Sequence, residues 1–372
     1  MDDQGRRLSD KDELPWGSEE VDPRDPTPAE LEELLLGGSA TMGRRDVSRA
    51  AGISLRDARR FWHALGFPIV ADEDTVFADA DLQALERVLE LVSSGALDED
   101  SALGMTRAFA RTADRLSVWQ TQLLAEALAG PGSEARIGEE DSRSVPDHEA
   151  ARAAARRLAE IADDLEPLLV YAWRRHLTAA IARMLADADP DLPGVGPYRM
   201  VGFADLVSFT SLVRRLTEGQ LARVVQRFEA MASDIVTAHG GRVIKTVGDE
   251  VLFVTVAPAP AAAISLDLVD AMAEDDLLPA ARVGLAAGHV VSRLGDVFGT
   301  TVNRASRLTA VAPPGGVLVD DAFAAHLKTL SGFEAVPQRS RTLRGIGNVR
   351  PSLLQRSSGD RGTPAAPLFS GR

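Results

Sequence analysis

The chain has 372 residues, of which 45% are hydrophobic and 26% charged, and its formal net charge at pH 7 is −14. This length favours two domains of ordinary size, with enough apolar residues for packed cores. The absence of cysteine excludes disulfides, thiolate metal sites and cysteine nucleophiles, and the acidic balance argues against a nucleic-acid footprint over the whole molecule.

The first segment, residues 1–27, is charged and has no hydrophobic periodicity, so we predict a disordered acidic lead. It lacks the apolar core of a signal peptide, and no apolar run in the chain has the length of a membrane span. These observations predict a cytoplasmic protein without a membrane segment.

Residues 28–190 have helical periodicity and are predicted to form an all-α domain. Short helical pieces, each followed by glycine, reach about residue 130. A long helical segment, from about 148 to 190, follows a polar stretch, and we interpret it as a helical linker. Pro167 is expected to interrupt this segment or to begin its second part, which would make a pair of helices.

The pattern changes after residues 190–197, which are dense in Pro and Gly and mark the domain boundary. From residue 197 to about 356, apolar runs of strand length alternate with amphipathic helices. The first pieces follow the order strand, helix, strand, strand, helix, strand, which is typical of a ferredoxin-like α+β domain. Thr217 and Gln220 form a capping box at the start of the first helix. Residues 357–372 are predicted to be a flexible tail.

Two carboxylates stand at informative places in this order. Asp205 ends the first strand, and Asp249 lies in the turn of the hairpin. Because the first strand and the hairpin are neighbours in a ferredoxin-like sheet, both side chains can converge on one edge. Paired carboxylates suit Mg²⁺ or Mn²⁺, and two such ions serve phosphoryl chemistry. Taken singly, a helix cap for Asp205 and ordinary turn chemistry for Asp249 are the simpler interpretations.

Three further polar side chains fall within regular elements. Lys245 lies in a strand, and simple alternation puts it on one face with Val243 and Val247, at an open edge or in a polar pocket. Asn303 and Arg307 are four residues apart in a predicted helix, so they share a face. Such a pair suits a charged phosphoryl transition state, although in isolation it also suits a solvated helix face.

The segments GFADLVSFT, VIKTVGDEVLF and GDVFGTTVNRASRL, in this order, closely resemble the catalytic core of the class III nucleotidyl cyclases. The resemblance covers about residues 197–355. It implies an adenylate cyclase that converts ATP to 3′,5′-cyclic AMP and pyrophosphate. It also implies a homodimer with shared active sites, each holding two divalent ions, Mg²⁺ or Mn²⁺.

The resemblance assigns metal and base contacts to matching positions. Asp205, Asp249 and the carbonyl of Leu206 match the metal ligands of the family. Lys245 and Asp296 match the pair that reads adenine, in which lysine donates to N1 and aspartate accepts from the 6-amino group.

The remaining matches concern the ribose and the phosphates. Asn303 matches the residue that orients the ribose, and Arg307 matches the arginine that stabilises charge at the α-phosphate. Arg344 falls where the family usually has a phosphate-binding lysine, a change that keeps the charge but alters its geometry.

Three alternatives stay open from the sequence. A GTP-using nucleotidyl cyclase is the first, although the guanylate cyclases of this family place different residues at the positions of Lys245 and Asp296. A diguanylate cyclase has a similar hairpin turn, but Val247 and Val251 replace its first glycine and last aromatic residue. Residues 41–90 resemble the winged helix-turn-helix of MerR-type DNA-binding regulators, with a basic face made by Arg44, Arg45, Arg49, Arg56, Arg59 and Arg60.

The helical half resembles regulatory domains that precede the catalytic domains of actinobacterial cyclases, which implies that it controls, and we expect inhibits, the catalytic dimer. His176 lies beside Arg174 and Arg175 in the linker, and histidine titrates near neutral pH, so a proton is one candidate effector. A surface histidine without a role is the simpler interpretation. A lipid within the apolar helical interior is the other candidate effector.

Overall fold

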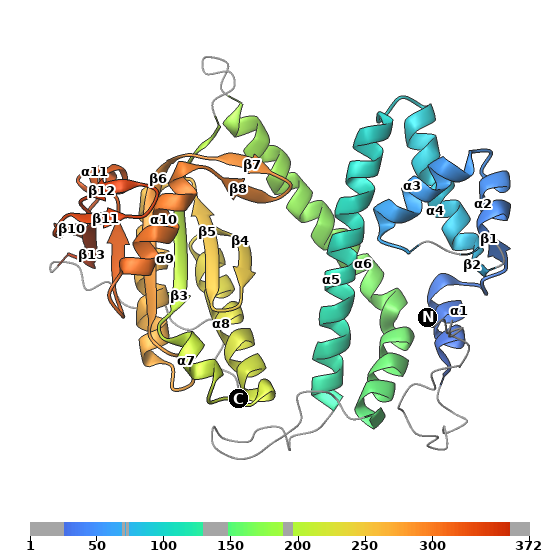
Figure 1. Cartoon of the computed structure of the whole chain (residues 1–372), viewed down its shortest axis with the longest axis horizontal. Helices are drawn as coiled ribbons and strands as arrows, with labels where there is room; N and C mark the ends of the chain where they lie inside the picture. The colour runs from blue at the N-terminus through green and yellow to red at the C-terminus, as the bar shows by residue number, and fades with distance from the viewer. Residues whose placement is uncertain (1–25, 69–70, 72–73, 129–147, 189–195, 358–372) are drawn as a thin grey trace, which may run out of the picture. The chain divides into compact units, whose positions relative to one another are not determined.

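The computed structural model describes residues 26–68, 71, 74–128, 148–188 and 196–357 (Figure 1). The predicted lead up to residue 25 and the predicted tail from residue 358 lie outside these ranges. Contacts divide the chain into two compact units, and the division within the described residues falls between Arg174 and Arg175. No helix in the described ranges combines the length and the apolarity that crossing a bilayer requires.

The first unit is helical, as predicted, and contains the elements α1 (Pro28–Leu36), β1 (Met42–Gly43), α2 (Arg44–Ala50), α3 (Leu55–Leu65), β2 (Thr75–Phe77), α4 (Asp79–Ser93) and α5 (Glu99–Leu128). The sequence did not predict the two-stranded antiparallel ribbon β1–β2, in which Met42 pairs with Phe77. Its strands are too short to show an alternating pattern. The ribbon closes a small core in which Trp62 of α3 stacks on Phe77, with ring centroids 4.6 Å apart.

Helix α6 spans His148–Asp187 as one continuous helix, so the prediction that Pro167 divides this segment into two helices is wrong. Proline removes one backbone donor and crowds the preceding turn. The forty residues of α6 supply helical hydrogen bonds on both sides of Pro167, so the loss of one bond does not end the helix.

The second unit is built on a seven-stranded sheet with the order β10-β13-β9-β6-β3-β5-β4. Its first half contains β3 (Tyr198–Leu206), α7 (Phe209–Val213), α8 (Glu218–Ala238), β4 (Arg242–Val247), β5 (Glu250–Thr255), α9 (Pro258–Glu274) and β6 (Ala281–His289). The four strands of this half lie in the order β6-β3-β5-β4 and are antiparallel, which confirms the ferredoxin-like prediction.

The rest of the unit contains β7 (Val291–Arg293), β8 (Asp296–Phe298), α10 (Thr300–Val311), β9 (Val317–Val319), α11 (Asp321–Leu327), β10 (Phe333–Pro337), β11 (Arg341–Leu343), β12 (Gly347–Val349) and β13 (Ser352–Arg356). Strand β9 joins the sheet parallel to β6, whereas β7–β8 and β11–β12 are separate hairpins. The capping box of Thr217 and Gln220 begins α8, as predicted.

Alternating side chains of β3 divide the core of the second unit into two layers. Met200 and Ala204 pack in the large cluster that includes residues of α8, α9 and α11. Val201 and Phe203 face the opposite side, where α10 and β8 contribute Ala305 and other apolar residues. The end of β3 is therefore held between two packed layers, which fixes the position of its last polar residue, Asp205.

Candidate active site at the edge of the catalytic sheet

Asp205 is fixed by the strands on both sides of β3. It pairs in register with Glu250 of β5 and with Arg282 of β6. The Arg282 Nε donates to Asp205 Oδ2 at 2.7 Å, and Nη2 donates to the same oxygen. The carboxylate is thus oriented by a forked cation before any ligand binds.

Asp249 lies in the turn between β4 and β5, and its carbonyl accepts from the Leu206 N–H at 3.2 Å. Gly248 has a φ of 60°, which lets the tight turn form without strain. Burial raises the pKa of the Asp249 carboxyl, and the neighbouring Asp205 raises it further by its charge and hydrogen bond. Burial and the charges of Asp205 and Asp249 also raise the pKa of Glu250. Three carboxyl groups therefore share one small region beside Arg282.

Lys245 of β4 donates from Nζ to Asp296 Oδ2 of β8 at 2.6 Å. Burial raises the pKa of Asp296, but the bonds from Lys245 and the Val297 N–H outweigh it and lower the pKa overall. The prediction that Lys245 shares a face with Val243 is wrong, because the register of β4 shifts between these two residues. Such a bulge inserts an extra residue and reverses the alternation beyond it.

Asn303 and Arg307 share the exposed face of α10, as their spacing predicts. Within the part of the chain that the structure describes, neither side chain makes a hydrogen bond or an ion pair. Arg344 is also exposed, in the turn between β11 and β12. The structure brings Asp205 and Leu206 close to Asp249 and Lys245 close to Asp296, but the described residues show no hydrogen bond or ion pair from these groups to Asn303, Arg307 or Arg344.

Two comparisons with known proteins decide the family. The model of the adenylate and guanylate cyclase catalytic domain matches residues 199–355. An adenylate cyclase of Glutamicibacter nicotianae is 39% identical over 349 residues, which are 90% of this chain and 83% of that protein. The chain belongs to the class III adenylate cyclases.

Two further similarities accompany this assignment. A pH-sensitive adenylate cyclase of Mycobacterium tuberculosis is 32% identical over 343 residues, covering 89% of this chain and 83% of that protein. The solved structure of the adenylyl cyclase CyaB from P. aeruginosa is 21% identical, with a TM-score of 0.39 over 44% of this chain and 97% of the other. The family model and the relative from Glutamicibacter nicotianae make the chain an enzyme with a cyclase catalytic domain. This family generally uses divalent metal ions.

The carboxylates of this cyclase fit a divalent ion of a particular kind. Among the described residues, no group of three or more His, Cys, Asp or Glu side chains is placed to hold a metal. Burial, and then the charge of Asp205, raise the pKa of the Asp249 carboxyl, so a cation beside this pair would favour its ionised form. Two protein carboxylates suit Mg²⁺ or Mn²⁺, which complete their shells with water and substrate phosphates.

Sequence reasoning missed Arg282 and Glu250, which complete the charged region of this cyclase. Arg282 stands within the apolar strand ARVGLAAG, and a cation inside such a run requires a compensating anion. That signal is present in the sequence. The identity of its partner was not available, since it depends on the register of β3 against β6.

The basic face predicted for residues 41–90 is partly neutralised in the first unit. Arg49 pairs with Asp46 at 3.4 Å, and Arg60 contacts Glu99 and lies 3.9 Å from Asp100. These acidic neighbours offset part of the positive charge of that face.

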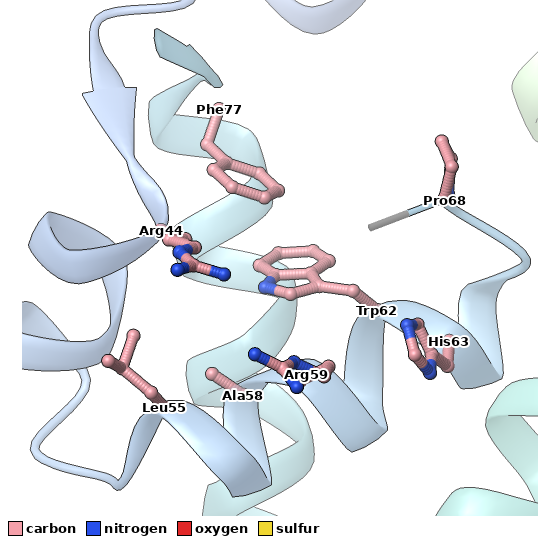
Figure 2. Close-up of a pocket in the computed structure, with 8 residues that line it drawn as sticks. All are labelled: Arg44, Leu55, Ala58, Arg59, Trp62, His63, Pro68 and Phe77. Atoms are coloured by element: carbon pink, nitrogen blue, oxygen red, sulfur yellow. The ribbon is translucent and has the colours of Figure 1, made fainter. Parts of the chain in front are cut away.

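Two other arginines of that face line a small cavity. Figure 2 shows Arg44 and Arg59 beside the indole of Trp62, with His63 and Pro68 at the other side. The cavity has a volume of about 30 Å³, and the buried Trp62 Nε1 has no acceptor among the described residues. Water is the ligand that suits such a volume, and it would satisfy the indole N–H. The cavity is too small to hold a nucleotide.

Proposed function

We propose that this cyclase converts ATP to 3′,5′-cyclic AMP and pyrophosphate. The observation that carries the proposal is the contact of Lys245 with Asp296 at 2.6 Å, which sets a donor beside an acceptor. Adenine offers the complementary pattern, an acceptor at N1 and a donor at its 6-amino group, whereas guanine reverses it. The names of the relatives, adenylate cyclases in two actinobacteria, support the same substrate.

The proposed reaction is an intramolecular displacement at the α-phosphorus. The ribose 3′-oxygen bonds to the α-phosphorus, the bond from that phosphorus to the bridging oxygen breaks, and the hydroxyl proton passes to solvent. Asn303 orients the ribose and Arg307 stabilises the charge that develops on the α-phosphate. Arg344 contacts the departing phosphates.

Asp205, Asp249 and the Leu206 carbonyl are proposed to hold two divalent ions, Mg²⁺ or Mn²⁺, in each site. When bound, such ions lower the pKa of the attacking hydroxyl and stabilise the leaving oxygen. Arg282 keeps the Asp205 carboxylate oriented through its forked contact. The raised pKa of Asp249, caused by burial and then by Asp205, supports a cation at this place.

We propose a homodimer in which each site combines residues of two chains. Asp205 and Asp249 are held by their own chain, whereas Asn303 and Arg307 are exposed and make no side-chain hydrogen bond or ion pair in the described residues. A second copy, related by a twofold axis, would bring the missing half to each of two equivalent sites.

We also propose that the chain has two functional parts. Residues 28–190 are a regulatory domain, with a linker at 148–190, and residues 197–356 are a catalytic domain. The regulatory part would inhibit the catalytic dimer, with a proton or a lipid as effector. His176 is exposed on α6, beside Arg175. If it is the proton sensor, His176→Ala flattens the pH–activity profile of the full chain, and an unchanged profile removes this assignment.

The test of the proposed function is product formation by the purified full-length protein. It is incubated with ATP or GTP and with Mg²⁺ or Mn²⁺ over a pH series, and the cyclic nucleotides are measured. Formation of cyclic AMP from ATP, well above cyclic GMP from GTP, supports the proposal. Preference for GTP, or no product from a folded dimer, would contradict it.

A further inference from the structure

The side chain of Asp320 contacts three elements, one of which is α10. Its side chain is fully buried, and Oδ1 accepts from the N–H groups of Phe323 and Ala287 at 2.8 and 3.2 Å. Its other oxygen, Oδ2, accepts from Arg304 Nη1 of α10 at 3.0 Å. Burial raises the pKa of Asp320, and the three donors oppose that rise. One carboxylate thus connects α11, β6 and α10.

The charge of Asp320 has a specific purpose in this arrangement. A helix N-cap needs only an oxygen acceptor, which serine, threonine or asparagine would supply without burying a charge. A buried carboxylate is costly unless a cation is paired with it. Arg304 is that cation, and its contact through Nη1 compensates the buried carboxylate, while the Arg304 side chain itself is 37% exposed. The Arg304 Nε is buried without an acceptor in the described residues.

Arg304 stands between the two candidate residues of α10, one position after Asn303 and three before Arg307. The helix lies directly on β6, since a Cβ at Gly284 would come within 2.3 Å of the Thr309 N. Near the start of α10, the Thr301 hydroxyl donates to the His289 carbonyl at 2.9 Å.

At the end of α10, the Thr309 hydroxyl has two acceptors in reach, the Ala305 carbonyl of its own helix at 2.9 Å and the Phe203 carbonyl of β3 at 3.2 Å. The side-chain hydrogen bond of Thr301 therefore ties the start of the helix to β6, and Thr309 ties its end less strongly. The ion pair of Arg304 with Asp320 fixes its middle.

We propose that Arg304 and Asp320 are positioning residues for catalysis, which hold α10 so that Asn303 and Arg307 meet the nucleotide in the reactive geometry. The proposal rests on the proposed function. Neither residue touches the substrate, and both act through the placement of the helix. Small displacements of a catalytic group slow a reaction by large factors, so the loss of this pair reduces kcat more than it changes KM.

A second corner of the same unit supplies a matched control. Asp275 accepts from the N–H groups of Leu277 and Leu278 at 2.9 and 3.0 Å, and Arg227 Nε donates to it at 2.7 Å. Its side chain is 5% exposed. Asp275 and Asp320 each accept hydrogen bonds from two backbone N–H groups and one arginine. The arginine of Asp275 lies on α8, away from α10.

The experiment compares Arg304→Gln and Asp320→Asn with Arg227→Gln and Asp275→Asn in the full-length protein. We expect the first two to lower kcat for cyclic AMP by about tenfold or more, with KM for ATP within about threefold. Arg304→Lys recovers part of kcat, because it keeps the charge without the planar fork. The double variant loses no more than either single variant, because the two residues form one unit. The control pair lowers Tm without changing kcat.

Hydrogen exchange of the α10 amides is a second measurement, and it does not depend on cyclase activity. Exchange in Thr300–Val311 is expected to be about tenfold faster in Arg304→Gln and Asp320→Asn, and unchanged in the two controls. Unchanged exchange in α10, or an equal loss of kcat in the controls, overturns the proposal. If the native protein makes no cyclic AMP, the proposed function fails and the exchange result alone decides whether this pair fixes α10.

Discussion

The two halves of the candidate site are held in different ways. Asp205 and Asp249 lie among charged neighbours of their own chain, with Arg282 bonded to the first and burial raising the pKa of the second. Asn303 and Arg307 are exposed on α10, without a side-chain hydrogen bond or ion pair in the described residues. The first half is preorganised by its own fold, whereas the second acquires partners only from a substrate or from another chain.

The strongest test of this comparison is complementation between two inactive variants. Asp205→Ala and Arg307→Ala are each expected to lower activity by about 10³-fold or more, since each removes a group that the transition state requires. Random mixing makes half of the dimers heterodimers, each with one intact site of two, so about a quarter of native activity returns. Production of cyclic AMP by the mixed chains is the measurement.

The matched control mixes Asp205→Ala with Asp249→Ala. Both substitutions lie in the half that one chain supplies to a site, so no combination of these chains restores an intact site. A mixture of Asp205→Ala and Arg307→Ala that stays inactive, despite demonstrated heterodimers, would show that the sites are not shared.

Substitution of each half alone also separates activity from stability. Arg307→Lys is expected to lower kcat by about 10²-fold without changing Tm, because the side chain is exposed and its planar fork matters only in the transition state. Asp205→Asn is expected to lower kcat and also to shift Tm, because Arg282 loses its charged partner. Steady-state kinetics and thermal unfolding of both variants test this. Equal Tm shifts in the two variants would show that the two halves of the site do not differ in how they are held.

Base recognition gives a smaller expected effect. Lys245→Ala removes the donor beside Asp296 and is expected to raise KM for ATP by about tenfold, with a smaller change in kcat. The ratio of kcat/KM for ATP to kcat/KM for GTP falls for the same reason. Arg293→Ala is the control, since Arg293 pairs in register with Asp296 but forms no ion pair with it in the described residues. An unchanged KM in Lys245→Ala would remove the base-reading assignment.

Local sequence patterns predicted the elements that carry the site. The buried strand that ends at Asp205, the hairpin with Asp249 and the helix with Asn303 and Arg307 each have their own periodicity. The face of Lys245 was predicted wrongly, because a bulge in β4 interrupts the alternation and no residue type marks it.

The partners of these side chains could not be predicted, because they depend on how distant elements come together. Arg282 lies 77 residues from Asp205, and the register of β3 against β6 brings them into contact. Asp320 contacts Arg304 only because α10 packs directly on β6. Pattern reasoning therefore identifies candidate side chains, whereas their orientation comes from tertiary packing.

The smallest predicted effect concerns Glu250 and the pH dependence of stability. Burial, and then the charges of Asp205 and Asp249, raise its pKa above the ordinary value of 4.5. The folded state therefore favours the protonated carboxyl, and this contribution is fully present below pH 4.5 and is lost as the pH rises through the raised pKa. Glu250→Gln lacks this loss, so its Tm should exceed that of the native protein increasingly as the pH rises from about 5 to about 8.

Thermal unfolding of both proteins in a chelating buffer, across that pH range, measures the effect. Added Mn²⁺ should narrow the difference, because a cation among these carboxyl groups offsets their repulsion. Glu274→Gln, at the exposed end of α9, is the control and should follow the native curve. Parallel curves for Glu250→Gln and the native protein would mean that neither burial nor the neighbouring carboxylates raise the pKa of Glu250. The only remaining difference between this half of the site and the exposed face of α10 would then be the contact of Arg282 with Asp205.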